Sequence, residues 1–286
     1  MADINPEPDS DPNIRTYRSP EVAEYYASLN YLTACERLLF EQYLRPGICI
    51  LDLGVGGGRT TPYLSSMAKL YIGVDYSEPM IAACRKKFPH LQFETGSAVD
   101  LSKFRSSNFD AVVMAFNVID YIFPENCRTH ALQEIHRVLK PNGIFIFSSH
   151  NPRAMLVRAS WNTKRVRGMA ESFAGRNPRL FCLILASLTV LRAVVAWLQA
   201  FRKSLGRIFR KLPARFFWTG RGYSMDPAHG GLTTFYSTPV QTVRELEANG
   251  FHVVQIMGDD YPRTSHLYST DWYYYVFSRT ETIGEK

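Results

Sequence analysis

The sequence predicts an α/β protein in which helices cover both faces of a mainly parallel sheet. Short apolar runs alternate along the chain with segments whose apolar residues recur at helical spacing. Runs that are apolar throughout are typical of parallel strands buried on both faces. Hydrophobic residues make up 46% of the 286 residues, which excludes disorder over most of the length.

The chain begins with a polar tail and a helical cap. The first dozen residues are acidic and Pro-rich and lack the basic and apolar regions of a signal peptide, so we expect a disordered tail over 1–16 and a cytoplasmic protein. Over 17–45, apolar residues near one face predict a helix that ends at Arg45-Pro46-Gly47. The five cysteines are scattered and odd in number, which argues against disulfides or structural zinc.

Seven strands and three helices complete the predicted domain. The expected helices are 79–88, 126–139 and 238–250, each ending near Pro, Gly or an aromatic residue. The expected strands are 49–53, 70–75, 91–96, 109–116, 144–149, 251–258 and 271–278. We therefore expect one domain over 46–151 and 236–280, with an insertion over 152–235 between its fifth and sixth strands.

A glycine-rich turn, LDLGVGGG, follows the first predicted strand. Its glycines let the backbone approach a ligand at the carboxyl edge of the sheet. Asp75, seventeen residues beyond Gly58, ends the second strand and can accept both ribose hydroxyls of a nucleoside. A dinucleotide site needs a further glycine where this chain has Arg59 or Thr61. Asp52 instead suits a ligand with a cationic amino group, as in S-adenosylmethionine (SAM).

Together these segments resemble a class I SAM-dependent methyltransferase. LDLGVGGG resembles the glycine motif of that family and VDYSEPMI its second-strand motif, while FDAVVMAFN and EIHRVLKPNGIFIFSS resemble the fourth-strand and fifth-strand segments. The similarity covers roughly 31–151 and 238–279. The resemblance implies a Rossmann-like seven-stranded sheet whose last strand is antiparallel, with S-adenosylhomocysteine (SAH) as a product.

The resemblance also implies which residues contact the cofactor. The glycine loop with Asp52 would line the methionine part, Asp75 would hold the ribose, and Tyr76 and Met80 would pack on the adenine. Many relatives carry an acid after the third strand to accept from the adenine amino group. In this chain Ser97, a backbone carbonyl or Asp100 would accept the hydrogen bond from the adenine amino group instead. The expected cofactor-binding residues are Asp52, Gly54, Gly56, Gly58, Asp75, Tyr76, Met80, Ser97, Ala98 and Phe116.

Methyl transfer from SAM requires alignment and exclusion of water, and a general base only for a weak nucleophile. His150 follows the fifth strand, and His229 lies in the turn-rich segment that returns from the insertion. Either is a candidate base, or an ordinary structural histidine. Asn117, Asp120 and Tyr121 follow the fourth strand at the same edge of the sheet, and Asn117 is expected to orient the acceptor. We expect no metal, because the adjacent Asp259 and Asp260 lack a third ligand.

The insertion is strongly basic. Between 151 and 221 there are fifteen Lys or Arg and one acid, whereas the rest of the chain has 18 basic and 25 acidic residues. The stretch 180–201 carries one charge, Arg192, but a single membrane crossing there would separate strands of one sheet, so we exclude a transmembrane helix. The residues that follow are amphipathic. They predict either a lid over the acceptor pocket or, through 180–212, contact with an anionic membrane.

We therefore expect a SAM-dependent methyltransferase, at the inner face of a membrane if the insertion binds lipid. The expected acceptor is an oxygen or nitrogen of a small molecule, such as a sugar or a lipid-linked intermediate. An RNA methyltransferase is the alternative enzyme, but 115–118 lacks the Pro-Pro motif of enzymes that methylate base amino groups. The alternative outside catalysis is a SAM-binding or membrane-binding protein without turnover, which the absence of the third-strand acid at Ser97 would allow.

Overall fold

The structure is a computed structural model, and it describes only part of the chain. Most of the predicted insertion and tail lie outside the described residues. Among the residues that are described, no helix is long and apolar enough to cross a membrane. The described residues are 13–152, 179, 180, 183, 187, 190, 220–226, 232–262 and 270–280.

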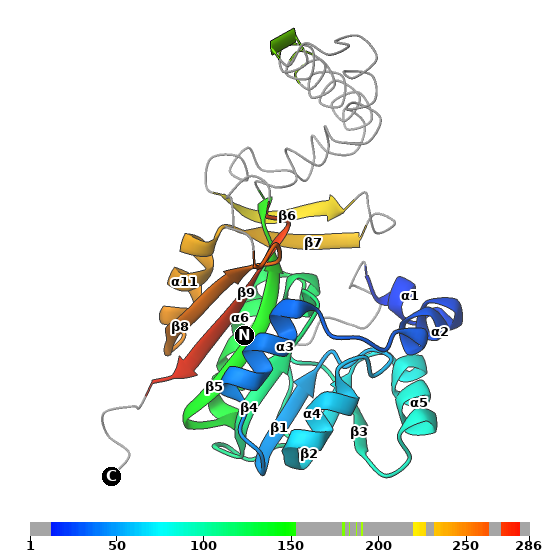
Figure 1. Ribbon diagram of the computed structural model, residues 1–286. Coiled ribbons are helices and arrows are strands. Elements are labelled where there is room, and N and C mark those ends of the chain that lie inside the picture. Colours follow the sequence, from blue (N-terminus) through cyan, green and yellow to red (C-terminus); the bar gives the residue numbers. More distant parts are fainter. Residues whose placement is uncertain are drawn as a thin grey trace.

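Seven strands form one sheet in the order β3-β2-β1-β4-β5-β9-β8 (Figure 1). Strands β1 to β5 are parallel, and β9 runs antiparallel to both of its neighbours, β5 and β8. The predicted α/β fold, with a mostly parallel sheet and an antiparallel last strand, is confirmed. The bounds are β1 (Ile48–Leu53), β2 (Ala68–Asp75), β3 (Gln92–Thr95), β4 (Phe109–Met114), β5 (Leu139–His150), β8 (Phe251–Gly258) and β9 (Trp272–Arg279).

Helices cover both faces of this sheet. Leu39, Leu64 and Ile81, from α3, α4 and α5, share one core with Ile50 of β1. The next residue along β1, Leu51, lies in a second core with side chains of α6 and α11. Successive strand residues point to opposite faces of the sheet. Because helices exclude water from both faces, the strands are apolar throughout. The bounds are α3 (Ala34–Tyr43), α4 (Thr61–Met67), α5 (Glu78–Lys87), α6 (Glu125–Val138) and α11 (Pro239–Glu247).

The single cap helix predicted over 17–45 is instead divided. Short helices α1 (Ile14–Tyr17) and α2 (Pro20–Ser28) precede α3, and Leu29 after α2 is extended. A capping box starts α3: Thr33 Oγ1 accepts from the Glu36 amide at 3.1 Å, and the Glu36 carboxylate accepts from the Thr33 amide at 2.8 Å. Because α3 begins at its own capping box, α2 is a separate helix. It packs on α5 near the glycine loop (Figure 1).

The last part of the insertion contains a β-hairpin that the sequence analysis did not predict. Strands β6 (Arg221–Asp226) and β7 (Leu232–Ser237) form a separate antiparallel pair beyond the end of β5 (Figure 1). The Asn13 side chain donates to the Thr233 carbonyl at 2.8 Å and accepts from the Thr233 amide at 2.8 Å. The hairpin is thereby tied to the segment that starts α1.

Candidate functional site

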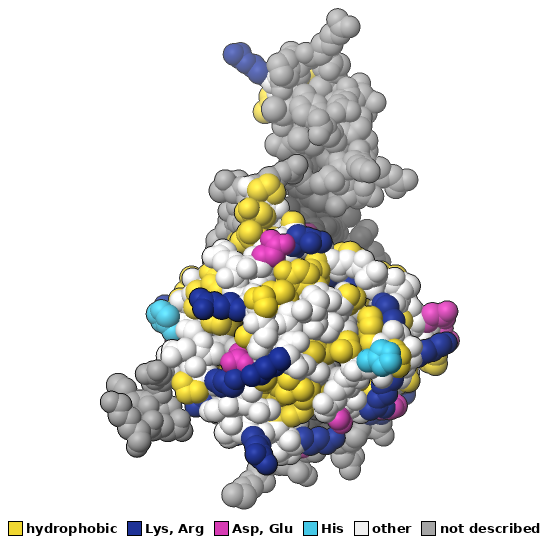
Figure 2. Space-filling view, turned by 60° about the horizontal axis from the view of Figure 1, so that its bottom comes forward, with side chains coloured by type: hydrophobic (Ala, Val, Ile, Leu, Met, Phe, Trp, Pro, Cys, Tyr) yellow, Lys and Arg dark blue, Asp and Glu magenta, His cyan; other side chains and the backbone are white. Residues whose placement is uncertain are grey.

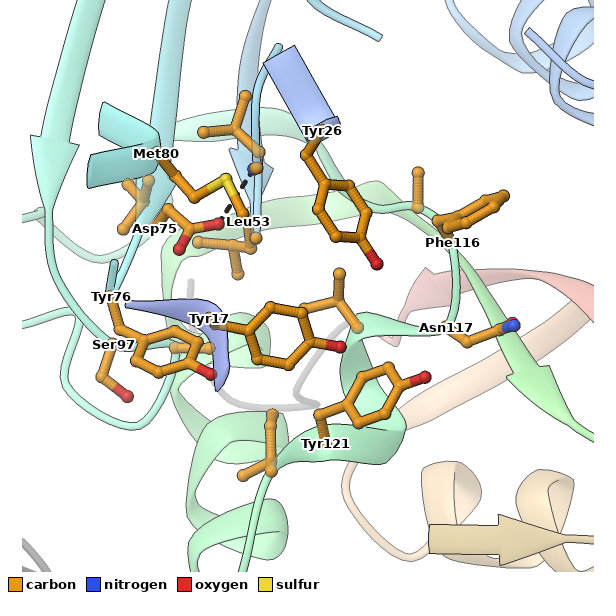
Figure 3. A pocket seen from close by; sticks show the side chains of 18 of the residues that line it. Tyr17, Tyr26, Leu53, Asp75, Tyr76, Met80, Ser97, Phe116, Asn117 and Tyr121 are labelled. Atoms are coloured by element: carbon orange, nitrogen blue, oxygen red, sulfur yellow. Dashed lines mark hydrogen bonds between the residues drawn. The ribbon is translucent and has the colours of Figure 1, made fainter. Parts of the chain in front are cut away.

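A cavity of about 490 Å³ lies at the carboxyl ends of the parallel strands. It opens where β1 and β4 are neighbours, which is the point at which strand order reverses and where open α/β sheets bind ligands. Its walls come from the loops after β1, β2, β3 and β4, from the end of β5, and from α1 and α2 (Figure 3). Its size falls within the range of roughly 300–1,000 Å³ of small-molecule sites.

The glycine loop combines close packing with one open position. Gly54 has φ +69°, and a Cβ there would lie 2.3 Å from Val118 Cγ1. A Cβ on Gly57 would meet the backbone of Ala27 in α2 at 2.2 Å. Gly56 has φ +54°, lines the cavity, and would meet nothing within 4 Å. The backbone at Gly56 is therefore bare toward the cavity, as a ligand lying against it requires.

Asp75 ends β2 and lines the cavity beside this loop. Its two carboxylate oxygens accept from the amides of Gly56 and Ser77, each at 2.9 Å (Figure 3). The side chain is buried, and burial raises its pKa to about 6 although both amide hydrogen bonds favour the ionised form. A buried carboxylate held in this way presents its remaining lone pairs to paired hydroxyl donors such as those of a ribose.

The raised pKa predicts that SAM binds more weakly in acid. Below about pH 6 the Asp75 carboxyl is protonated and loses the charge that accepts the ribose hydroxyls. If the ionised form alone binds, the dissociation constant rises about tenfold between pH 7 and pH 5. Isothermal titration calorimetry at both pH values measures this ratio. Asp75→Asn is the control and should remove most of the pH dependence. A wild-type ratio below about two would contradict the assignment.

Asp52 and Gly58 lie behind the cavity wall, and neither contributes to the cavity lining. The buried Asp52 carboxylate accepts from Thr60 Oγ1 and Tyr71 Oη, both at 2.8 Å. Burial raises its pKa to about 6 against those two hydrogen bonds. Asp52 thus fixes Thr60, the residue that precedes α4, through a hydrogen bond. The structure does not place it against the methionine part of a ligand, because its carboxylate points to the helix start.

Most of the remaining expected cofactor residues line one cavity. Asp100 does not. Its carboxylate accepts from the Ser102 amide at 3.0 Å and borders a smaller neighbouring cavity, which shares Thr95, Gly96 and Ser97 with the main one. Of the alternatives for the adenine amino group, Ser97 and a backbone carbonyl therefore stay within the cavity wall. The expected residues that line it are Gly54, Gly56, Asp75, Tyr76, Met80, Ser97, Ala98, Phe116 and Asn117.

Three tyrosines also line the cavity: Tyr121, which the sequence analysis placed at this edge of the sheet, and Tyr17 and Tyr26, which it did not assign to the site. Tyr17 of α1 lies 5.7 Å from Tyr121 and 6.2 Å from Tyr26 of α2 between ring centroids, and the three rings approach one another in Figure 3. Burial raises the pKa of the Tyr17 phenol, so it stays a neutral hydrogen-bonding group. The many tyrosines near the N-terminus were the sequence feature that could have indicated this role. A helical pattern alone does not show which face of the helix lines a cavity.

Arg59 occupies the position at which a dinucleotide site would have a further glycine. Its guanidinium donates to the two carboxylate oxygens of Glu36 at 2.6 and 2.7 Å and lies 4.8 Å from the centroid of the Phe116 ring. It also lines the cavity. The bulk and pairing of this side chain exclude the close helix packing that a dinucleotide loop needs.

Gly57→Ala is expected to loosen the N-terminal cover of the cavity. The new Cβ would overlap the backbone of Ala27, so α2 must move away and carry Tyr26 with it. Overpacking of this kind costs about 1–3 kcal/mol. We expect a lower melting temperature and SAM binding weakened by about tenfold, measured by calorimetry. Gly96→Ala is the thermal control, because its Cβ would meet Val74 at an ordinary 3.5 Å. An unchanged SAM affinity in Gly57→Ala would contradict the covering role of α2.

A histidine–aspartate pair stands at the other end of the cavity. His150 Nδ1 lies 2.9 Å from Asp120 Oδ2, and the His150 amide donates to the same oxygen at 2.6 Å. Asp120 Oδ1 accepts from Ser149 Oγ at 2.7 Å. Asp120 belongs to the short 3₁₀ helix η2 (Val118–Tyr121) that follows β4. The sequence analysis placed both residues at this edge of the sheet but did not pair them.

Asn117 is placed beside this pair by a strained backbone. Phe116 and Asn117 have φ of +61° and +63°, in the left-handed region that few non-glycine residues adopt. The Asn117 Nδ2 atom lies 3.2 Å from His150 Nε2. Its Oδ1 atom is buried and has no hydrogen-bond partner among the described residues. His229, the other candidate base, lies outside the described residues.

These features fit SAM. The bare backbone at Gly56, the Asp75 carboxylate and the aromatic walls offer contacts for an amino acid part, a ribose and an adenine in that order along one cavity. The fold and the site together define a SAM-dependent methyltransferase of class I, and residues 51–147 match the family model described as a methyltransferase domain. Residues 51–147 therefore form a SAM-dependent methyltransferase domain, and SAM is its cofactor.

Known proteins are similar to this chain in sequence and in fold. An uncharacterized methyltransferase-like protein of Schizosaccharomyces pombe is 26% identical over 263 residues, which cover 89% of this chain and 84% of that protein. A fatty-acid O-methyltransferase of Mycolicibacterium smegmatis is 28% identical over 173 residues, 54% of this chain and 59% of that enzyme, so the match spans less than two thirds of its length. The 1,6-didemethyltoxoflavin-N1-methyltransferase of Burkholderia thailandensis, solved with bound SAH, shares the fold with a TM-score of 0.51 at 15% identity, covering 96% of this chain and 85% of that one.

Proposed function

We propose that the protein transfers the methyl group of SAM to an oxygen or nitrogen of a small molecule, and that His150 removes the proton of that acceptor. The observation that carries this proposal is the Asp120–His150 pair at the wall of the cofactor cavity. SAM supplies an activated methyl group, so the protein has to align the acceptor, exclude water and take up one proton. A pair in which a buried carboxylate orients an imidazole is suited to the last of these tasks.

The partners of His150 define how the base would work. With Nδ1–H donating to Asp120, the lone pair of Nε2 faces Asn117, whose Nδ2 donates to it. An acceptor hydroxyl would replace the Asn117 donor and give its proton to Nε2 while the methyl group is transferred. The unpartnered Oδ1 of Asn117 would then accept a hydrogen bond from a second protic group of the acceptor. Asn117 would orient the acceptor in this arrangement.

The walls near His150 support a largely apolar acceptor. Among the cavity-lining residues on this side are the side chains of Phe116, Ile122, Phe123 and Trp272. Burying an apolar molecule against them contributes about 25 cal/mol per Å² of apolar surface. A lipid-linked or other amphiphilic acceptor with one protic head group matches these walls. The fatty-acid O-methyltransferase is a relative whose printed substrate is also apolar.

The alternatives gain less support. On the face at which the parallel strands begin, the Lys and Arg side chains are spread out, several beside an Asp or Glu, so that face offers no RNA-binding patch (Figure 2). A protein without turnover has no use for a proton acceptor at the cavity wall. Contact of 180–212 with an anionic membrane falls largely outside the described residues and stays a prediction.

An acceptor screen with methyl-labelled SAM tests the proposed function. The panel should contain apolar phenols, aliphatic alcohols, amines and free fatty acids, each beside an analogue whose protic group is already methylated. We expect label in an alcohol, phenol or amine and none in the matched methylated analogue. Turnover only with carboxylic acids, which are ionised at neutral pH and need no base, would contradict the role given to His150.

A further inference from the structure

We propose that Arg128 is a positioning residue for methyl transfer, which holds the Asp120 carboxylate, and through it the His150 ring, in place. Arg128 lies on α6 and does not touch the cavity. It would act on the reaction through Asp120. The inference rests on the proposed function of His150, and its test separates the two.

Arg128 clamps the segment that carries Asp120. The Arg128 side chain is fully buried, and its Nη1 donates to the Ile119 carbonyl at 2.6 Å. The same Nη1 lies 3.6 Å from Asp120 Oδ1. One guanidinium nitrogen therefore contacts both the backbone of η2 and the carboxylate that faces His150. A shift of Arg128 would move both together.

The other side of the guanidinium is held by α11 and by the β6–β7 hairpin. Its Nε and Nη2 donate to the Glu245 carboxylate at 3.1 and 3.2 Å, and its centre lies 4.4 Å from the centroid of the Phe235 ring. Arg221 of β6 approaches Glu245 at 3.5 Å. Buried partners on two sides leave Arg128 little freedom to reorient.

Two buried carboxylates thus share one buried cation. Burial opposes the charge of Arg128, but the attraction of Glu245 and Asp120 outweighs burial and raises the pKa of the guanidinium. Arg128 is then charged at every pH at which the protein is folded. Asp120 is fully buried, and within the described part of the chain Arg128 is the guanidinium or ammonium group in ion-pair contact with it. A buried carboxylate without such a partner is costly.

The orientation of the His150 ring depends on this carboxylate. The groups facing the imidazole are Asp120 of η2, Asn117 before η2, Tyr121 of η2 and Tyr236 of β7. Asp120 Oδ2 lies 2.9 Å from Nδ1 of the ring. A displaced Asp120 would therefore turn Nε2 away from the acceptor.

The double variant Arg128→Met/Glu245→Met tests the inference. It replaces a buried ion pair by apolar side chains of similar length and leaves no orphaned Glu245 charge. Asp120 keeps its contacts with Ser149 and His150, and the melting temperature shows whether the fold is retained. We expect kcat for the acceptor found in the screen to fall about 10–100-fold at constant KM, with SAH affinity unchanged. Arg137→Met is the matched control, because Arg137 lies on the same helix and pairs with Glu134 instead.

The outcomes distinguish the inference from the proposed function. An unchanged kcat in a folded double variant overturns the inference. If His150→Ala itself keeps full kcat, the proposed function fails instead, whatever the double variant does. If the double variant fails to bind SAH, Arg128→Lys is the deciding variant, because lysine keeps the positive charge but lacks the planar set of donors. Arg128→Lys should lower kcat about tenfold at constant KM, and an unchanged kcat overturns the inference.

Discussion

Asp75→Ala is expected to weaken the binding of SAM and SAH by at least about 100-fold at neutral pH. Hydrogen bonds to a charged group contribute about 1.5–3 kcal/mol each, and the variant removes two from the ribose. It also removes the acceptor that holds the amides of Gly56 and Ser77 in place. Calorimetry with both ligands gives the change, and the melting temperature without ligand shows whether the fold is retained.

Two further variants make the Asp75 result specific. Asp75→Asn keeps one oxygen acceptor and is expected to fall between the wild type and Asp75→Ala. Asp100→Ala removes a carboxylate that does not line the cofactor cavity, so the affinity of this variant for SAM should stay within about twofold of the wild type. An Asp75→Ala protein that is folded and binds SAM within about threefold of the wild type would mean that the ribose lies elsewhere.

His150→Ala is expected to lower kcat by about 10²–10⁴-fold, the usual contribution of a positioned general base. The affinity for SAM should change little, because the contacts assigned to the cofactor lie along the glycine loop and at Asp75. Single-turnover rates with the acceptor found in the screen isolate the chemical step. Asp120→Asn should cause much of the same loss, since an amide can present its NH₂ group to Nδ1 and favour the wrong tautomer.

Partial rescue by added imidazole would strengthen the assignment of His150. The variant leaves room at the cavity wall, and a free imidazole can enter and accept the proton. Tyr236→Phe serves as a packing control, because its ring lies 5.6 Å from His150 and the substitution keeps the ring. A His150→Ala enzyme with full kcat for a hydroxyl acceptor would leave the base unassigned and return attention to His229.

The parts of the fold that the sequence predicted are those set by local pattern. Each strand of a parallel sheet is buried on both faces, so Ile50 and Leu51 are both apolar although they point in opposite directions. The glycines at 54 and 56 follow from the positive φ of the turn. Asp75 follows from its place at the end of β2. These signals lie within short windows of sequence, where spacing carries the information.

Contacts between distant segments carried no such signal. Arg128 and Glu245 are 117 positions apart, and no periodicity links them. Asn13 and Thr233 are likewise 220 positions apart and linked by no sequence pattern. Their hydrogen bonds fix the position of α1. Asp52 was predicted at the ligand because its sequence position matched the motif, whereas its side chain points to Thr60 and Tyr71. Backbone position follows from a motif more reliably than side-chain direction does.

The β6–β7 hairpin was missed for a different reason. Its strands are six residues each, and β6 contains Gly222 and a mixture of polar residues. Short strands without clear alternation look like loop in a single sequence. In the structure they are stabilised by burial of Phe235 and by contacts with η2. The hairpin therefore depends on tertiary packing.

A crystal structure of the SAH complex tests the central claim most directly. We predict that the ribose hydroxyls lie within hydrogen-bonding distance of the Asp75 carboxylate, that the homocysteine part follows the backbone at 54–57, and that the thioether sulfur points toward Asn117 and His150. An SAH molecule bound outside this cavity, or bound in it with the sulfur directed away from His150, would contradict the account.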